Sequence, residues 1–394
     1  MKATDIVLIE GARTPFTRFC GSFRDISAID LATIASKEAI TRSKVELGEI
    51  DHVVFGNVIQ SSPDAVFFAR HVGLKTGVPT HAPALTVNRL CGSGLESITS
   101  AARLILSGDS QVVLAGGAEN MSQIPYVIRG ARTGLKLGAA PMQDYLWEAL
   151  YDSYGDCTMS GTGENVAVRY GITREEADEH AYNSHQKALR SMESGILQEE
   201  IVPVSVVDKK TTRLVVRDEH PRTDTTRETL AQLPTVFKQG GVITAGNASG
   251  INDGGAAVVI TSADYAAKRN LKPIARLVSW SAVGVEPKYM GIGPVDAIRH
   301  ALTKANMSLN DLDLIEINEA FSTQYLACQK ELGFDPAIGN VNGGAVALGH
   351  PLGASGTRIV LALIYELKRR NKKFGATSVC IGGGQGIAAI WEIL

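Results

Sequence analysis

Cys91, in this sequence of 394 residues, is followed directly by the small residues Gly92, Ser93 and Gly94. The run 88–94 predicts a strand, a glycine-rich turn and then a helix. A cysteine at the start of a helix is expected to favour the thiolate, because the helix dipole and free N–H groups stabilise negative charge. A small buried cysteine at a tight turn is the alternative, and Ser93 is a rival nucleophile.

Cys380 is a second candidate cysteine, and it lies in the last part of an apolar run that ends at Ile381, just before Gly382, Gly383 and Gly384. We predict a final strand and no helix after these glycines, which excludes a dinucleotide-binding loop. Consecutive glycine N–H groups suit an oxyanion hole, a set of donors that stabilises developing negative charge on an oxygen. A purely structural buried cysteine is the alternative.

His350 lies among glycines and alanines in the segment 343–356 and is followed by Pro351. Small neighbours allow a basic side chain to reach its partner at hydrogen-bonding distance, so His350 is a candidate general base. A loop histidine that caps backbone groups is the alternative. We expect the next helix to begin near Gly356.

Asn318 and Glu319 follow the apolar strand predicted at 312–317. Polar side chains at the end of a buried strand are unusual unless they bind another polar group. An asparagine amide can position a water or a carbonyl oxygen. The alternative is that Asn318 is the N-cap of a helix beginning at Ala320.

An α/β frame is expected to position these groups, because apolar runs typical of strands buried on both faces alternate with amphipathic helices. Three pairs of segments also recur in the same order, which indicates two similar α/β halves. The pairs are 49–57 with 311–319, 86–88 with 340–342, and 113–117 with 379–383.

Three regions are expected along the chain. The first half comprises residues 1–118 and 250–272, the second half comprises 273–394, and the more highly charged segment 119–249 is interpreted as an inserted substrate-binding domain. Such boundaries are uncertain by a few residues.

The composition is that of an ordinary soluble protein, with 44% hydrophobic and 20% charged residues. The 39 basic and 41 acidic residues argue against a global field for nucleic acid or a membrane surface. The sequence offers no signal peptide, transit segment or membrane span. Five scattered cysteines without a C-x-x-C pair argue against disulfides and structural zinc. We therefore expect a reduced, cytoplasmic protein.

Taken together, the four segments resemble the thiolase family, and the resemblance covers essentially the whole chain. Its most specific elements are NEAF at 318–321, the GHP-containing segment 343–356 and C-x-GGG-x-G at 380–386. The resemblance implies the thiolase fold, in which two similar α/β halves form an α-β-α-β-α layered core that carries an inserted loop domain.

The resemblance also implies roles for residues. Cys91 would carry the acyl group, His350 would activate it, and Cys380 would take or return the α-proton of the second acyl-CoA. Asn318, through a water, and His350 would form one oxyanion hole. The N–H groups of Cys91 and Gly382 would form the other. No metal or redox cofactor is expected.

The inserted domain is expected to bind coenzyme A (CoA). Its segment from Lys209 to Arg227 holds six basic and three acidic residues, although a mixed charge run usually marks a solvated surface. By resemblance, Arg222 and Thr225 match contacts to the nucleotide of CoA and Ser249 a contact to pantetheine. The full set of expected contacts is Arg222, Thr225, Ser249, Met159, Phe237 and Phe321.

The resulting functional prediction is an acetyl-CoA C-acetyltransferase that converts two acetyl-CoA into acetoacetyl-CoA and CoA. A degradative 3-ketoacyl-CoA thiolase of broader chain length is the nearest alternative. Two features leave the chain-length preference open between them: Thr158-Met159 stands where biosynthetic thiolases often carry His-Met, and the segment 57–65 is similar to that of mitochondrial-type 3-ketoacyl-CoA thiolases. A decarboxylating ketoacyl synthase and a non-catalytic lipid-binding protein are more distant alternatives. We also expect a homo-oligomer, a dimer of dimers, because the segment 121–150 resembles a tetramerisation loop.

Overall fold

The computed structural model describes residues 2–138, 141–208 and 211–394. Its largest sheet has ten strands. These are β1 (Ile6–Arg13), β2 (Thr17–Arg18), β3 (His52–Gly56), β4 (Ala84–Val87), β5 (Val112–Asn120), β12 (Asn252–Ser262), β13 (Ala275–Gly284), β14 (Leu314–Ile317), β15 (Phe374–Ile381) and β16 (Gln385–Ile393). They pair in the order β14-β15-β16-β13-β1-β12-β5-β3-β4, with β2 on β12.

The sheet consists of two similar halves, as the repeated segments predicted. In the first half β3 pairs in parallel with β5, which pairs antiparallel with β12. In the second half β14 pairs in parallel with β15, which pairs antiparallel with β16. The halves meet where residues 6–8 of β1 pair with β13. The second half has only an isolated bridge, between Ile315 and Gly339, where the first half has β4.

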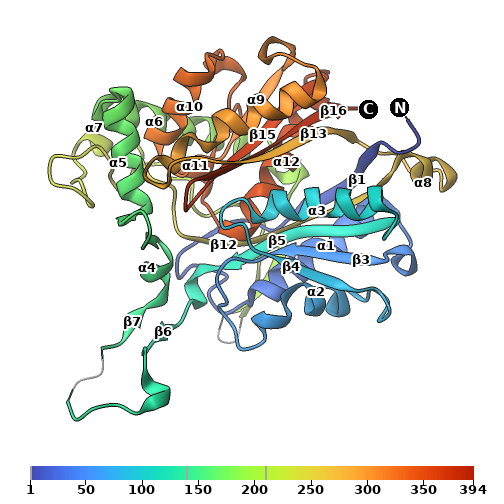
Figure 1. Ribbon diagram of the computed structural model, residues 1–394, viewed down its shortest axis with the longest axis horizontal. Helices are drawn as coiled ribbons and strands as arrows, with labels where there is room; N and C mark the ends of the chain where they lie inside the picture. The colour runs from blue at the N-terminus through green and yellow to red at the C-terminus, as the bar shows by residue number, and fades with distance from the viewer. Residues whose placement is uncertain (1, 139–140, 209–210) are drawn as a thin grey trace.

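The helices complete the five layers, which confirms the predicted thiolase fold (Figure 1). The central layer is α3 (Ser93–Ser107) against α12 (Leu352–Arg369), and their apolar side chains pack with both halves of the sheet. One outer layer contains α1 (Ala28–Ser43) and α2 (Phe68–Thr76), and the other contains α9 (Gly293–Ala305) and α10 (Ser322–Leu332). The first residues of α3 and α12 follow Cys91 and His350 closely, so this central pair fixes both.

The contact between α3 and α12 depends on glycines. A Cβ on Gly356 would lie 2.3 Å from the backbone nitrogen of Leu95, and one on Gly94 would lie 2.7 Å from the carbonyl oxygen of Gly353. Thr357 adds a hydrogen bond, its Oγ1 donating to the Gly94 carbonyl at 2.9 Å. The two helices therefore approach each other backbone to backbone.

Replacing Gly356 with alanine should lower the free energy of unfolding by about 1–3 kcal/mol, because the added methyl group overpacks a buried contact between two helix backbones. The midpoint of urea denaturation measures this loss. Gly48→Ala is the matched control, since a Cβ there meets nothing within 4 Å. Equal midpoints for the two variants would contradict the account of this contact.

The segment between β5 and β12 adds no strand to the ten-stranded sheet within the described residues. Its pairs of strands are β6 (Tyr126–Val127) with β7 (Gln143–Asp144), β8 (Tyr151–Asp152) with β9 (Cys157–Thr158), and β10 (Val204–Asp208) with β11 (Thr211–Val215). Its α-helices are α4 (Tyr145–Ala149), α5 (Met159–Tyr170), α6 (Arg174–Glu193) and α7 (Arg227–Ala231). The arm that carries β6 and β7 reaches away from the layered core (Figure 1). The predicted domain boundaries stay a prediction, and Lys209 and Lys210 of the basic run lie outside the described residues.

Two predicted helix starts are wrong. The helix after His350 begins at Leu352 rather than near Gly356, because the small residues of its first turn serve close packing against α3 and do not end a helix. The helix after Asn318 begins at Ser322 rather than Ala320, and its N-cap residue is Phe321. Two short helices, α8 (Ala263–Lys268) and α11 (Ala345–Leu348), complete the set of described α-helices. Within the described ranges, no helix has the length and apolar character needed to cross a bilayer.

Candidate active site

Cys91 lies in the turn between β4 and α3. Hydrogen bonds from the side chains of neighbouring residues fix the conformation of this turn. Asn88 Oδ1 accepts the N–H of Leu90 at 2.9 Å. Ser93 Oγ donates to the Leu90 carbonyl at 2.7 Å and accepts the N–H of Arg89 at 2.9 Å. Because the buried Ser93 hydroxyl is fully used in this turn, the structure favours Cys91 as the nucleophile.

The ionisation predicted for Cys91 needs correction. Burial raises the pKa of the Cys91 thiol to about 11, although the N–H groups of Gly382 and of Cys91 itself act in the opposite direction. The argument from the helix dipole fails because the cost of desolvating a thiolate exceeds the gain from these donors. At neutral pH Cys91 is a thiol that a base must deprotonate.

His350 is buried and held in one tautomer. Burial lowers the pKa of its imidazole to about 3, with a further contribution from Arg358, so the ring is neutral. Ser355 Oγ donates to the Pro351 carbonyl at 3.0 Å and lies 2.6 Å from His350 Nδ1. Because the serine hydrogen is already used, Nδ1 must carry the ring hydrogen. Nε2 therefore keeps its lone pair, as a general base requires.

These two pKa values predict how the reactivity of Cys91 depends on pH. In the protein without ligand, the rate of alkylation of Cys91 by iodoacetamide should rise about tenfold per pH unit between pH 7 and 9, because only the thiolate reacts. Both shifts favour the thiol–imidazole pair over the thiolate–imidazolium pair, so no plateau should occur in this range. Peptide mass spectrometry of timed samples measures the rate. A rate independent of pH would contradict the neutral pair.

Asn318 lies beside His350, with its Nδ2 3.3 Å from His350 Nε2. Its own N–H donates to the Ser378 carbonyl at 2.9 Å, and its buried Oδ1 has no hydrogen-bond partner among the described residues. The N-cap alternative is wrong, since Phe321 is the N-cap of α10. With Nε2 unprotonated, the Asn318 amide donates to the imidazole, so the two side chains are in direct contact.

Cys380 and Gly382 come to the same place from β15 and the turn after it. Burial raises the pKa of the Cys380 thiol well above its usual value, and the neighbouring Cys91 raises it further. The N–H of Gly382 points at the Cys91 thiol, as does the N–H of Cys91 itself. A Cβ on Gly382 would lie 2.9 Å from the sulfur of Met159, so only glycine fits here without a shift of Met159.

An apolar cavity of about 150 Å³ adjoins His350. It is lined by Met121, Trp147, Leu150, Thr158, Met159, Ser160, Phe237, Ala248, Ser249, Gly250, Ile251, Phe321, His350 and Leu352. Four of the predicted CoA contacts, Met159, Phe237, Ser249 and Phe321, are among them. The rings of Trp147 and Phe237 stack with their centroids 6.4 Å apart.

The other two predicted contacts lie in a second cavity, of about 240 Å³, which also contains His185, His220 and Asp224. Thr225 is buried in it, whereas the Arg222 guanidinium is exposed and lies 3.3 Å from Asp224. The segment 245–251 contributes residues to both cavities. A molecule with an apolar and a polar end can therefore follow one stretch of chain from His350 to Arg222.

Three residues of this site were missed from the sequence. Ser355 follows His350 by five residues, and this spacing was the only available signal. Trp147 lies in a region without a chemical motif. Glu119, the penultimate residue of β5, is buried, and its carboxylate accepts the N–H groups of Ile59 and Gly353. It joins the segment after β3 to the start of α12, a contact between residues far apart in sequence.

Comparison with known proteins assigns the family. The family model for the N-terminal domain of thiolase matches residues 6–264, and that for the C-terminal domain matches residues 271–393. The mitochondrial 3-ketoacyl-CoA thiolase of Bos taurus is 48% identical over 98% of both chains, and an acetyl-CoA acetyltransferase of Pseudomonas aeruginosa is 46% identical over the same shares. A solved structure of human mitochondrial 3-ketoacyl-CoA thiolase in complex with CoA is 47% identical, has a TM-score of 0.96, and is covered to 99% by this chain, all of which is aligned.

The chain therefore belongs to the thiolase family and is an acyltransferase. This finding confirms the predicted family and class of enzyme. It argues against the alternative that the protein is a non-catalytic lipid-binding protein.

Proposed function

We propose that this protein transfers acyl groups between CoA and the α-carbon of acetyl-CoA through a thioester on Cys91, with acetyl-CoA and acetoacetyl-CoA as a substrate pair. The observation that carries the proposal is a pair of thiols beside N–H donors, together with a neutral imidazole against an amide whose backbone N–H is hydrogen-bonded to the strand of Cys380. Cys91, Cys380 and Gly382 meet directly, and His350 lies beside Asn318. No metal or redox cofactor forms part of the proposal.

In the thiolysis direction, His350 Nε2 takes the proton of the Cys91 thiol, and the sulfur attacks the 3-keto carbon of the substrate. The N–H groups of Cys91 and Gly382 stabilise the oxygen of the carbonyl under attack. The bond between the α- and 3-carbons then breaks, which leaves the acyl group on Cys91 and the electron pair on acetyl-CoA.

The departing fragment is an enolate, whose charge lies largely on the thioester oxygen. Asn318, through a water, and the protonated His350 stabilise this negative charge by hydrogen bonds. The Cys380 thiol gives its proton to the α-carbon of the enolate. The Cys380 thiolate then takes the thiol proton of free CoA, whose sulfur attacks the thioester on Cys91. The shortened acyl-CoA leaves, and the released Cys91 sulfur takes its proton back from His350. In the condensation direction every step runs in reverse, so the Cys380 thiolate removes the α-proton.

The binding of CoA is part of the proposal. The apolar cavity beside His350 suits pantetheine and an acyl group, with Ser249 as the polar contact. The second cavity suits the charged nucleotide end, with Arg222 and Thr225 as contacts. The solved structure of a related thiolase in complex with CoA supports the proposal that this protein binds CoA.

A broader 3-ketoacyl-CoA thiolase is the second candidate, favoured by the apolar lining of the cavity. A series of 3-ketoacyl-CoA substrates from four to sixteen carbons, or about that range, distinguishes the two in a thiolysis assay, with Cys91→Ala as the inactive control. A loss of kcat/KM beyond acetoacetyl-CoA supports the first candidate, and activity maintained along the series supports the second. No turnover of any member would contradict both.

We also propose that the protein is a dimer of dimers. The edge strand β4 exposes Leu85, and the nearby Val66 and Phe67 are exposed as well. The arm with β6 and β7 exposes Tyr126 and Leu137, and apolar patches of this kind often mark interfaces. Light scattering tests the oligomeric state, and a monomer would contradict it. The cytoplasmic location stays a prediction. The word mitochondrial in the names of some relatives refers to the location of those proteins alone.

A further inference from the structure

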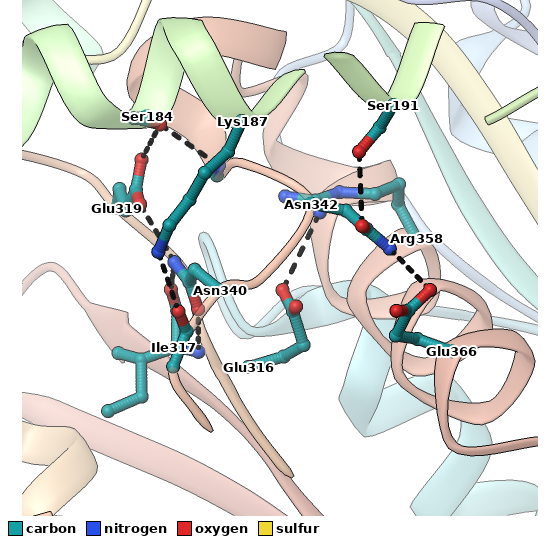
Figure 2. A network of polar contacts seen from close by, with 12 residues as sticks. Ser184, Lys187, Ser191, Glu316, Ile317, Glu319, Asn340, Asn342, Arg358 and Glu366 are labelled. Atoms are coloured by element: carbon teal, nitrogen blue, oxygen red, sulfur yellow. Dashed lines mark hydrogen bonds and ion pairs between the residues drawn. The ribbon is translucent and has the colours of Figure 1, made fainter. Parts of the chain in front are cut away.

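Buried polar residues surround the carboxylate of Glu319, the residue that follows Asn318 in the chain, and Figure 2 shows Ser184 and Asn340 against it. Three segments distant in sequence meet at this carboxylate. The contacts are Asn340 Nδ2 at 2.9 Å and His180 Nε2 at 3.2 Å from Oε1, and Ser184 Oγ at 2.8 Å and the Val346 N–H at 3.1 Å from Oε2.

Glu319 must be an ionised carboxylate for these contacts to form. The side-chain amide of Asn340, the Ser184 hydroxyl and the Val346 N–H all donate, and a carboxylate only accepts. Burial alone would raise the pKa of Glu319, but His180 together with the hydrogen bonds from Asn340 and Ser184 outweighs burial and lowers it to about 2.

Asn340 fixes the chain on the other side of Asn318. Its Oδ1 accepts the N–H of Ile317 at 2.9 Å, and its Nδ2 donates to the Ile317 carbonyl at 2.8 Å as well as to Glu319. The residue before Asn318 and the residue after it are therefore both held by one buried pair (Figure 2).

The same pair reaches the segment that leads to His350. Ser184 Oγ accepts the N–H of Gly344 at 3.0 Å while it donates to Glu319. A Cβ on Gly344 would lie 2.1 Å from the carboxyl carbon of Glu319, so only glycine allows this contact. Helix α6 of the inserted segment thus fixes the loops of Asn318 and His350 relative to each other.

We propose that Glu319 and Asn340 are positioning residues that hold the Asn318 amide where it meets the enolate oxygen. The proposal rests on the proposed function, in which Asn318 acts in the enolate step while the N–H groups of Cys91 and Gly382 act in acylation. Loss of the pair should therefore impair one step far more than the other.

The test is Glu319→Gln, which keeps the shape but places an NH₂ group against donors. Two rates are measured on one sample: acetylation of Cys91 by acetyl-CoA, and entry of deuterium from D₂O into the methyl group of acetyl-CoA. We expect deuterium exchange to fall about 10- to 100-fold and acetylation to change less than threefold, because a small misplacement affects only the step that uses Asn318. The ratio of the two rates is independent of the fraction of folded protein.

Two further variants keep the test decisive. Ser184→Ala removes one bond to Glu319 and should shift the ratio in the same direction by less. Ser191→Ala is the matched control, because Ser191 lies on the same helix and donates to Asn342 at 3.0 Å without a contact to Glu319. It should leave the ratio unchanged.

Equal losses of both rates in Glu319→Gln would overturn the positioning role, as would a shifted ratio in Ser191→Ala. If the unaltered protein catalyses neither acetylation nor exchange, the proposed function itself fails. That outcome is recognised before any variant is compared.

Discussion

Replacing Cys91 with alanine should lower the rates of thiolysis and condensation by a factor on the order of 10⁴ or more, because no covalent intermediate can form. Steady-state assays in both directions measure the loss. The effect should fall on kcat, since the proposed CoA contacts, such as Ser249 and Thr225, remain in place.

Cys157→Ala is the matched control for this change. Cys157 is half-buried like Cys91, and it belongs to the inserted segment rather than to the turn after β4. Its loss should change the rates less than about threefold. Comparable losses in the two variants would indicate a general effect on folding and would contradict the role of Cys91.

Replacing Cys380 with alanine should lower the rate of condensation about 10²- to 10⁴-fold, the range typical of a lost general acid or base. Acetylation of Cys91 should survive within about tenfold, because that step needs no proton from carbon. Deuterium exchange into acetyl-CoA should fall together with condensation. Stopped assays of the three reactions separate the steps.

Cys328→Ala controls for the cavity left by a buried cysteine. Cys328 is as deeply buried as Cys380, and its thiol donates to the Gly291 carbonyl in the outer layer. Its removal should cost stability without a selective loss of exchange. If Cys380→Ala reduces acetylation as severely as exchange, Cys380 is not the group that handles the α-proton.

Much of the frame could be predicted from the sequence because its signals are local. Apolar runs marked the strands, and the repeated segments indicated two halves. Cys91, Cys380 and His350 each stood beside glycines, which marked tight turns. The start of the helix after His350 was misplaced for the same reason: the small residues from 353 to 355 were interpreted as a loop before a helix near Gly356, although Gly353 and Gly356 both serve contact between α3 and α12.

The rest depends on contacts between distant segments. The pKa of the Cys91 thiol depends mainly on its burial by the surrounding protein. Burial raises this pKa, whereas the position of Cys91 before a helix indicated a lowered one. The tautomer of His350 depends on Ser355 and on the Pro351 carbonyl. The pairing of Glu319 with Asn340 and Ser184 joins an inserted helix to two loops, and no spacing in the sequence indicates it.

The central claim is that Cys91 carries the acyl group, and mass spectrometry of the acid-quenched enzyme after brief exposure to acetyl-CoA tests it most directly. We predict a mass increase of one acetyl group, located by peptide mapping on Cys91 and removed when free CoA is added before the quench. The absence of this thioester, or its presence on another cysteine while Cys91 stays unmodified, would contradict the account.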